Sequence, residues 1–445
     1  MIKTTLSKID TTFTLLFFYW TVFEWPLLSK IDNLSIIITI RSSIDLLPLF
    51  LVLLNILFGN WEIRSYELKI FVDVLLILII TSLSTMIEGY NPLTAVQISS
   101  VSFRYVPFLI LTRLSTPKIM EKLYKHVRII FWLMVVISLV EIANKTLFIK
   151  VFLPSPSIFG KPLPTIYRSQ NIEISATFIN TIDFSFFMIA LSCFYIIYTK
   201  RKVEKIIVFI TSLVLLFLSF STASLLCMVL AGVLLFGGKS RFLIIGFLIL
   251  VTGMVVNPRI MKMLTDADSI GSFIKVSNDY SRLGFFTKLM PQFLRGDPKD
   301  VFFGMGLDTH LVDDKLSGYR DIPLMLTFGG NNVTLLKDVY WLGIIITEGI
   351  IVLFLYIRIL YLLYSRSKKS LSGDKKQFPK VMIFVVVFLG LFNQVLDVKS
   401  FSFCFWTMAG IMINYGCENR DAVNLQRKYL QAGNCWAEKN LVNPE

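Results

Sequence analysis

Long apolar runs separated by short polar breaks are the dominant pattern of this sequence. Because a bilayer core of about 30 Å requires about 20 apolar residues per helix, each such run predicts a membrane-spanning helix, and about twelve are present. The predicted spans are residues 11–28, 36–58, 68–88, 94–112, 129–147, 176–198, 206–221, 223–237, 241–256, 339–363, 380–396 and 399–416. The pattern therefore predicts an all-α integral membrane protein.

Charged residues interrupt two of these runs. Arg41 and Asp45 fall within 36–58, and Arg104 falls within 94–112, so we expect either segment to be broken or tilted rather than a plain span. Arg104 also lies in the polar stretch from Ser99 to Tyr105. A charge in such a stretch favours an aqueous cavity over contact with lipid.

The basic connectors between the runs predict the orientation. Lys and Arg in short loops remain in the cytoplasm, and the basic loops here all fall on one side if the N-terminus is inside. Both termini are then expected to be cytoplasmic. The predicted organisation is helices 1–9 in residues 1–256 with an outer loop at 148–175, a large outer loop at 257–338 between helices 9 and 10, helices 10–12 in 339–416, and a cytoplasmic tail at 417–445.

Composition agrees with a membrane protein. Hydrophobic residues make up 55% of the chain and charged residues 17%, against about 45–50% and 25% in soluble domains. The net charge of +14 fits cytoplasmic loops that face anionic lipid, so nucleic acid is not the expected partner. The five cysteines form no CxxC pair and have no histidine at metal-ligand spacing, so neither a metal site nor a cofactor is predicted.

Ionisable side chains inside the predicted spans are candidates for function because each costs about 2.5–3.5 kcal/mol to insert. For Glu24, Asp73, Glu141 and Arg358 we favour a simpler interpretation, in which they reach the headgroups or pair with one another. The whole set is Glu24, Asp73, Arg104, Glu141, Asp183, Glu348, Arg358 and Asp397.

Arginines beside tyrosines recur in the predicted outer loops, at Arg168, Arg282 and Arg320. A guanidinium stays charged and binds phosphate through two parallel hydrogen bonds. These residues predict a pyrophosphate site at the outer membrane surface, and a merely solvated loop face is the alternative.

Several short motifs occur in a familiar order over about residues 165–355. They are Tyr167-Arg168 followed by Ala176-Thr177-Phe178-Ile179-Asn180, then Ser281-Arg282, Phe302-Phe303-Gly304-Met305-Gly306, Asp338-Val339-Tyr340 and Glu348-Gly349-Ile350. In this order they resemble the O-antigen polymerase and O-antigen ligase superfamily of bacterial envelope glycosyltransferases. Thr222 stands where that family usually has an arginine. Asp338 stands where the ligases have a histidine, which favours a polymerase.

The resemblance implies a GT-C-like membrane enzyme of the bacterial inner membrane. It would polymerise undecaprenyl-pyrophosphate-linked repeat units into O-antigen or a related surface polysaccharide at the periplasmic face, by inverting, metal-independent transfer. It implies catalytic roles for Asp338 and Arg282, substrate binding by Arg168, Arg104, Arg320 and Tyr340, and a chain-length regulator as a further partner. A helix cap is the alternative role for Asp338, and for Tyr340 the aromatic belt of any membrane protein is the favoured interpretation.

Two other functions fit the same pattern. A ligase would transfer finished polymer to lipid A-core, and a flippase would transport lipid-linked repeats through a similar number of spans. A flippase has no need of a long outer loop rich in arginine, so the predicted loop at 257–338 favours an enzyme.

Overall fold

The structure is a computed structural model in which the described part of the chain is helical throughout and contains no strand. The predicted all-helical class is therefore confirmed for these residues. They are 2–31, 33–59, 64–87, 89–115, 118–152, 174–178, 180–219, 221–236, 289–307, 312, 315, 339–370, 377–393 and 395–413. The predicted span at 241–256, much of the loop at 257–338 and the tail lie outside them.

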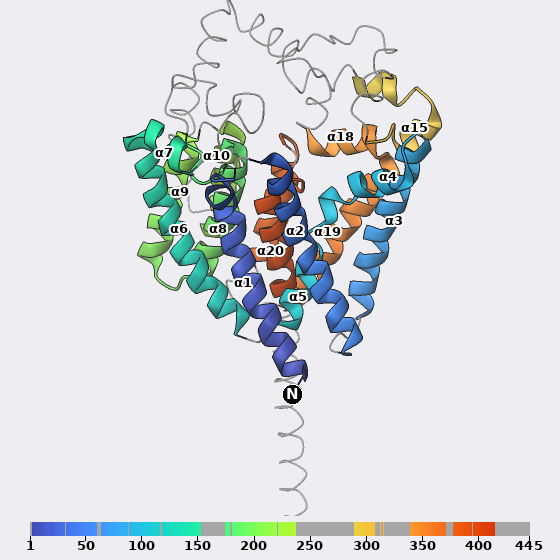
Figure 1. Cartoon of the computed structure of the whole chain (residues 1–445). Coiled ribbons are helices and arrows are strands. Elements are labelled where there is room, and N and C mark those ends of the chain that lie inside the picture. The colour runs from blue at the N-terminus through green and yellow to red at the C-terminus, as the bar shows by residue number, and fades with distance from the viewer. Residues whose placement is uncertain are drawn as a thin grey trace, which may run out of the picture.

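The first three helices follow the first three apolar runs (Figure 1). They are α1 (Ile2–Leu28), α2 (Leu34–Leu57) and α3 (Ser65–Ile87). Asn33 caps α2 by accepting backbone N–H bonds from Ser35 and Ile36. The helix is then continuous to Leu57 through Pro48, so the charges at Arg41 and Asp45 do not break it.

The predicted break in residues 94–112 is confirmed. The segment divides into α4 (Pro92–Ser99), the short 3₁₀ helix η1 (Val101–Phe103) and α5 (Pro107–Leu114). The two halves of this span are bent by 44°. Pro107 has no N–H to donate and is well suited to the first position of a helix, which fits the start of α5 at this residue. Arg104 lies at this break.

The middle of the chain surrounds one buried helix. It contains α6 (Ile119–Ala143), α7 (Lys145–Phe152), α8 (Thr181–Tyr198), α9 (Lys202–Leu218) and α10 (Thr222–Phe236). Every residue of α8 from Phe184 to Ile197 is buried, because α6, α9, α10 and α20 pack around it. Such all-round apolar burial marks a central helix rather than a lipid-facing one.

The C-terminal part corrects one prediction. Its helices are α15 (Pro298–Phe303), α18 (Tyr340–Thr347), α19 (Ile350–Ser370), α20 (Gln377–Leu389) and a last helix, Lys399–Ile413. The predicted single span at 339–363 is wrong, because α18 and α19 are separate. Gly349 between them has φ +89°, a left-handed conformation that an α-helix does not contain.

Helix length and hydropathy make this a multi-pass membrane protein. Among the described residues, five helices are long and apolar enough to cross a bilayer, namely α2, α3, α6, α8 and Ile350–Ser367 of α19. The bent pair Pro92–Ser99 and Val101–Leu114 raises the number to six if it forms one span. The larger total of about twelve remains a prediction.

The two ends of the helical bundle carry different segments of the chain. Figure 1 shows α1 beginning at one end, whereas α7 and α15 lie at the opposite end. Residues of α7 begin the predicted outer loop at 148–175, and α15 belongs to the predicted loop at 257–338. The described parts of both predicted outer loops therefore lie on the side opposite the start of α1.

A small second core attaches the large loop to the bundle. Leu289 and Phe293, from a helical turn at 289–293, are fully buried with Met305 and Val339. Ile346 of α18 belongs to the same cluster. The described part of the predicted loop, residues 289–305, is thus packed against α18 by apolar contacts.

Candidate functional site

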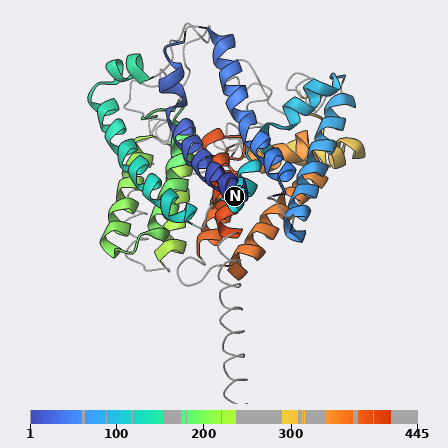
Figure 2. The ribbon, with the colours of Figure 1, turned by 60° about the horizontal axis from the view of Figure 1, so that its bottom comes forward.

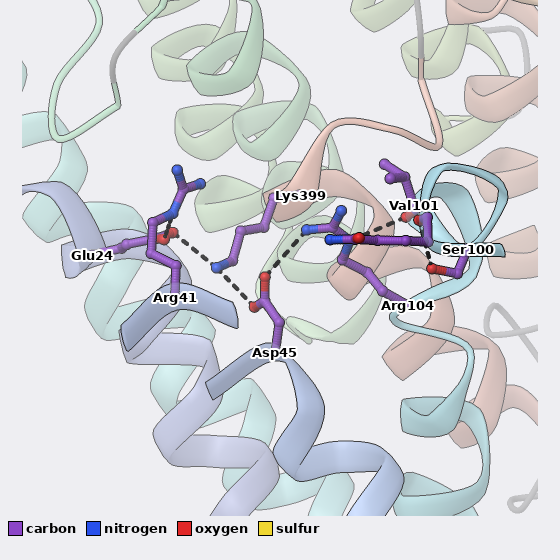
Figure 3. Close-up of polar contacts among 8 residues, drawn as sticks. Glu24, Arg41, Asp45, Ser100, Val101, Arg104 and Lys399 are labelled. Carbon is purple, nitrogen blue, oxygen red and sulfur yellow. Dashed lines mark hydrogen bonds and ion pairs between the residues drawn. The ribbon is translucent and has the colours of Figure 1, made fainter. Parts of the chain in front are cut away.

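Five charged side chains form a chain of alternating sign inside the helical bundle (Figure 3). Arg41 of α2 pairs with Glu24 of α1. Lys399 lies between two carboxylates, 3.0 Å from Glu24 and 2.9 Å from Asp45. The second Asp45 oxygen contacts Arg104 at 3.3 Å. Three cations and two carboxylates leave this chain with a formal charge of +1, and an arginine stands at each end.

Local helix geometry explains part of this arrangement. Arg41 and Asp45 are four positions apart on α2 and therefore lie on one face. The guanidinium of Arg41 also lies over the ring of Trp25, 4.5 Å from its centroid. Glu24 is only 3% exposed. A carboxylate so deeply buried needs cationic partners, and Arg41 and Lys399 supply two.

Both terminal arginines line one cavity of about 250 Å³. Ligand sites usually measure about 300–1,000 Å³, so this cavity suits a charged head or a single ring rather than a whole large ligand. Its walls are formed by Arg41, Val101, Arg104, Tyr105, Asp183, Asp397, Val398 and Lys399.

Two carboxylates outside the charged chain complete the cavity wall. Asp183 lies in the first turn of α8, where its N–H donates to the side chain of Asn180 at 2.7 Å. Asp397 accepts a hydrogen bond from Ser102 of η1. The cavity thus presents cations that can bind an anion together with carboxylates that can accept a proton.

Tyr340 lies next to this polar region. Its side chain is 4% exposed, its hydroxyl donates to Tyr356 at 3.5 Å, and its ring packs edge-on against Trp341 at 5.1 Å. Ser102, which donates to Asp397, also lies close to the Tyr340 hydroxyl. The beginning of α18 therefore lies beside the cavity wall.

The structure brings together two of the residues implied by the resemblance. Arg104 lines the cavity, and Tyr340 lies close to Ser102 of the short helix η1 that precedes Arg104. The other four, Asp338, Arg282, Arg168 and Arg320, lie outside the described residues.

Other charges of the predicted spans have partners away from the cavity. Asp73 of α3 pairs with Arg358 of α19 at 3.3 Å, which is one of the two arrangements expected for these charges. Glu141 of α6 instead accepts backbone N–H bonds from Ser175 and Ala176, at 3.0 and 2.8 Å. It thereby fixes the segment that leads into α8.

Sequence reasoning missed the role of Lys399. The residue falls at the predicted start of the last span, where a lysine is usually an interfacial anchor. Arg41 and Asp45 were expected only to disturb their span. The sequence does contain a signal for this cluster of charges. Arg41 and Asp45 are opposite charges four positions apart inside an apolar run, and Asp397 and Lys399 are a second opposite pair between two apolar runs.

No group of three or more His, Cys, Asp or Glu side chains that could hold a metal occurs in the part of the chain that the structure describes. No protein-family model and no curated protein matches this sequence.

Proposed function

We propose that this protein polymerises undecaprenyl-pyrophosphate-linked repeat units into a surface polysaccharide. The observation that supports this function is the cavity, in which arginines and carboxylates face the same space inside an apolar helical bundle. Glycosyl transfer from a lipid pyrophosphate needs both kinds of group. Cations stabilise the departing pyrophosphate, and a base receives the proton of the attacking hydroxyl.

Arg41 and Arg104 suit the leaving group. Each has one ion-pair partner in the charged chain, whereas Lys399 has two. A guanidinium carries five N–H donors in a planar fork, so an arginine paired with one carboxylate retains donors for phosphate oxygens. Arg282, Arg168 and Arg320 of the predicted outer loops are proposed to bind the same pyrophosphate.

A carboxylate is proposed to take the acceptor's proton. The resemblance implies that this base is Asp338, two positions before Tyr340. Tyr340 lies close to Ser102, which donates to Asp397 of the cavity wall. This proximity supports a common site for Asp338 and the cavity, in which Asp397 and Asp183 hold acceptor hydroxyls.

The proposed setting is the bacterial inner membrane, with about twelve spans and a GT-C-like arrangement. If the N-terminus is cytoplasmic, the end of the bundle that carries α7 and α15 faces the periplasm (Figure 1). Glu24, near the C-terminal end of α1, then lies in the outer half of the bundle. The cavity would thus open where flipped lipid-linked repeats arrive.

The test is the surface polysaccharide of cells that lack this protein. A polymerase defect leaves a single repeat on lipid A-core, because flipping and ligation continue. Restoring the gene restores long polymer, whereas Arg41→Gln leaves single repeats at normal protein level, because a neutral amide cannot stabilise the pyrophosphate charge. Gel separation of the polysaccharide measures all three.

The matched control is Arg201→Gln, which removes an exposed arginine at the start of α9 and should leave polymer length unchanged. The two alternative functions give different products. A flippase defect leaves no repeat outside, and a ligase defect leaves long polymer on the carrier lipid. Either pattern in the deletion strain would reject polymerisation.

A further inference from the structure

The mouth of the cavity lies between α2 and the break after α4. The side chains of Arg41, on α2, and Arg104, at the break, are 32% and 37% exposed. Val101 of η1, also in the cavity wall, is 37% exposed. Lys399, at 15%, and Tyr105, at 1%, lie deeper. These three accessible wall residues come from α2 and from the break after α4, on either side of the opening.

These elements belong to different parts of the bundle. α2 packs on α5 and α1, whereas α4 packs on α3. In Figure 1, α2 and α3 approach each other toward the end where α1 begins and diverge toward the end that carries α15, and Figure 2 shows the same separation. The ion pair between Asp45 and Arg104 bridges the diverging part.

Apolar side chains continue from this ion pair along α2. Leu49, Leu53 and Ile56 follow Asp45 at helical spacing on the same face. They are about half exposed, at 49%, 48% and 46%. The opening thus combines a partly exposed guanidinium with an apolar strip, which is the pattern that an amphiphile with an anionic head and an apolar tail would match.

The charged chain allows Arg104 to change partner at low cost. An unpaired buried carboxylate is strongly unfavourable. Asp45, however, also contacts Lys399 at 2.9 Å and keeps that cation when Arg104 leaves. A phosphate is a suitable new partner for Arg104, because it can accept two parallel hydrogen bonds from the guanidinium.

We propose that a lipid diphosphate reaches the cavity sideways from the bilayer, between α2 and the α3–α4 pair, and that its phosphate replaces Asp45 as the partner of Arg104. The tail then lies along Leu49, Leu53 and Ile56. The choice of a diphosphate head rests on the proposed function, whereas the lateral route rests on the exposure and charge of these residues.

The first experiment measures binding of undecaprenyl diphosphate to the full-length protein in phosphatidylcholine nanodiscs. Arg104→Gln should weaken binding roughly ten- to a hundredfold, the loss expected for a charged hydrogen-bonded contact. Asp45→Asn should strengthen binding several-fold, because it removes the carboxylate that competes for Arg104. Two results would overturn the proposal that phosphate replaces Asp45 as the partner of Arg104. One is equal affinity of the wild type and Arg104→Gln for the lipid, and the other is weaker lipid binding by a folded Asp45→Asn variant.

The control is the double variant Asp73→Asn/Arg358→Gln. This pair also joins an aspartate and an arginine at 3.3 Å in the bundle, and its arginine is 52% exposed, but neither residue lines the cavity. Its affinity should equal that of the wild type. A loss as large as that of Arg104→Gln would mean that any exposed intramembrane arginine attracts the lipid, and the proposed site would be rejected.

The second experiment tests the lateral route with a photoreactive amino acid at Leu53 of α2 or at Val214 of α9, which are 48% and 46% exposed. Undecaprenyl diphosphate should label at Leu53 and not at Val214, and excess phosphatidylglycerol should not compete. Equal labelling at both positions, or full competition by phosphatidylglycerol, would show that Leu53 contacts any bilayer lipid without selectivity. Either result would overturn the proposal.

The two proposals fail separately. If the lipid binds and labels as expected while the deletion strain shows no polymerisation defect, the lateral site stands and the polymerase function falls. If the deletion strain shows the single-repeat pattern while Arg104→Gln binds lipid normally, the polymerase function stands and this site falls.

Discussion

Single residues show two ways in which this bundle accommodates charge. Asp73 is fully buried, and neither of its side-chain oxygens has a hydrogen-bond partner apart from the ion pair with Arg358. In the part of the chain that the structure describes, Arg358 pairs with this one carboxylate. In the charged chain, by contrast, Lys399 serves Glu24 and Asp45 at once. An isolated pair stabilises packing, whereas a shared cation lets neighbouring arginines contact a ligand.

The isolated pair predicts a characteristic response to mutation. Arg358→Leu should lower the free energy of unfolding by about 1–3 kcal/mol, because the buried Asp73 carboxylate loses the one cation that pairs with it among the described residues. Adding Asp73→Asn should recover most of that loss, since no charge is then left unpaired. Thermal unfolding in detergent measures both. A double variant as unstable as Arg358→Leu alone would contradict the pairing.

At the level of elements, the break between α18 and α19 is also where the large loop is attached. Gly304, after α15, lies so close to the backbone of Thr347 and Glu348 that no Cβ would fit, and Gly349 lies equally close to the carbonyl of Phe302. Backbone bonds from Met305 to Ile346 (2.8 Å) and from Gly306 to Thr347 (3.0 Å) join the same segments. Two sequence motifs that are distant in the chain are therefore parts of one contact.

Two glycine substitutions distinguish the cost of a positive φ from the cost of a steric clash with neighbouring backbone. Gly349→Ala and Gly89→Ala both place a Cβ at positive φ, +89° and +101°, which costs about 1–2 kcal/mol. Only Gly349 also has backbone atoms where the Cβ would stand, whereas Gly89 has nothing within 4 Å. Gly349→Ala should therefore lower the thermal stability clearly more than Gly89→Ala. Equal shifts would show that the close approach is unimportant.

At the scale of the whole molecule, the placement of α7 and α15 opposite the start of α1 makes the topology testable (Figure 1). The basic connectors predict that the side where α1 begins is cytoplasmic. Reporter fusions in the basic connectors should signal cytoplasm, and fusions in the predicted outer loops should signal the outside. The cytoplasmic positions are Arg64, Lys122, Lys202 and Lys369, and the outer ones are Ser157 and Gly318. An outside signal at Lys369 would reverse the large loop and the proposed face of the cavity.

Most of the helices could be predicted from the sequence, because apolar length and helical conformation are local properties that the bilayer enforces. The break in residues 94–112 was also predictable from local sequence, because a charged residue, Arg104, interrupts the apolar run, and Pro107 follows three positions later. The division between α18 and α19 was not. Apart from Glu348 the run around Gly349 is apolar, and the close backbone contact at Gly349 is with Phe302, which lies 47 positions earlier.

The sequence by itself determined that this is a helical membrane protein, and it singled out Arg104 as a charge in need of polar surroundings. Only the tertiary structure decided which charges meet. Glu24, Arg41, Asp45, Arg104 and Lys399 come from α1, α2, the α4–α5 break and the last helix. Ion pairs depend on distances of a few ångströms between helices, and no spacing along the chain encodes those distances. The apolar runs specify the helices, and their packing specifies the site.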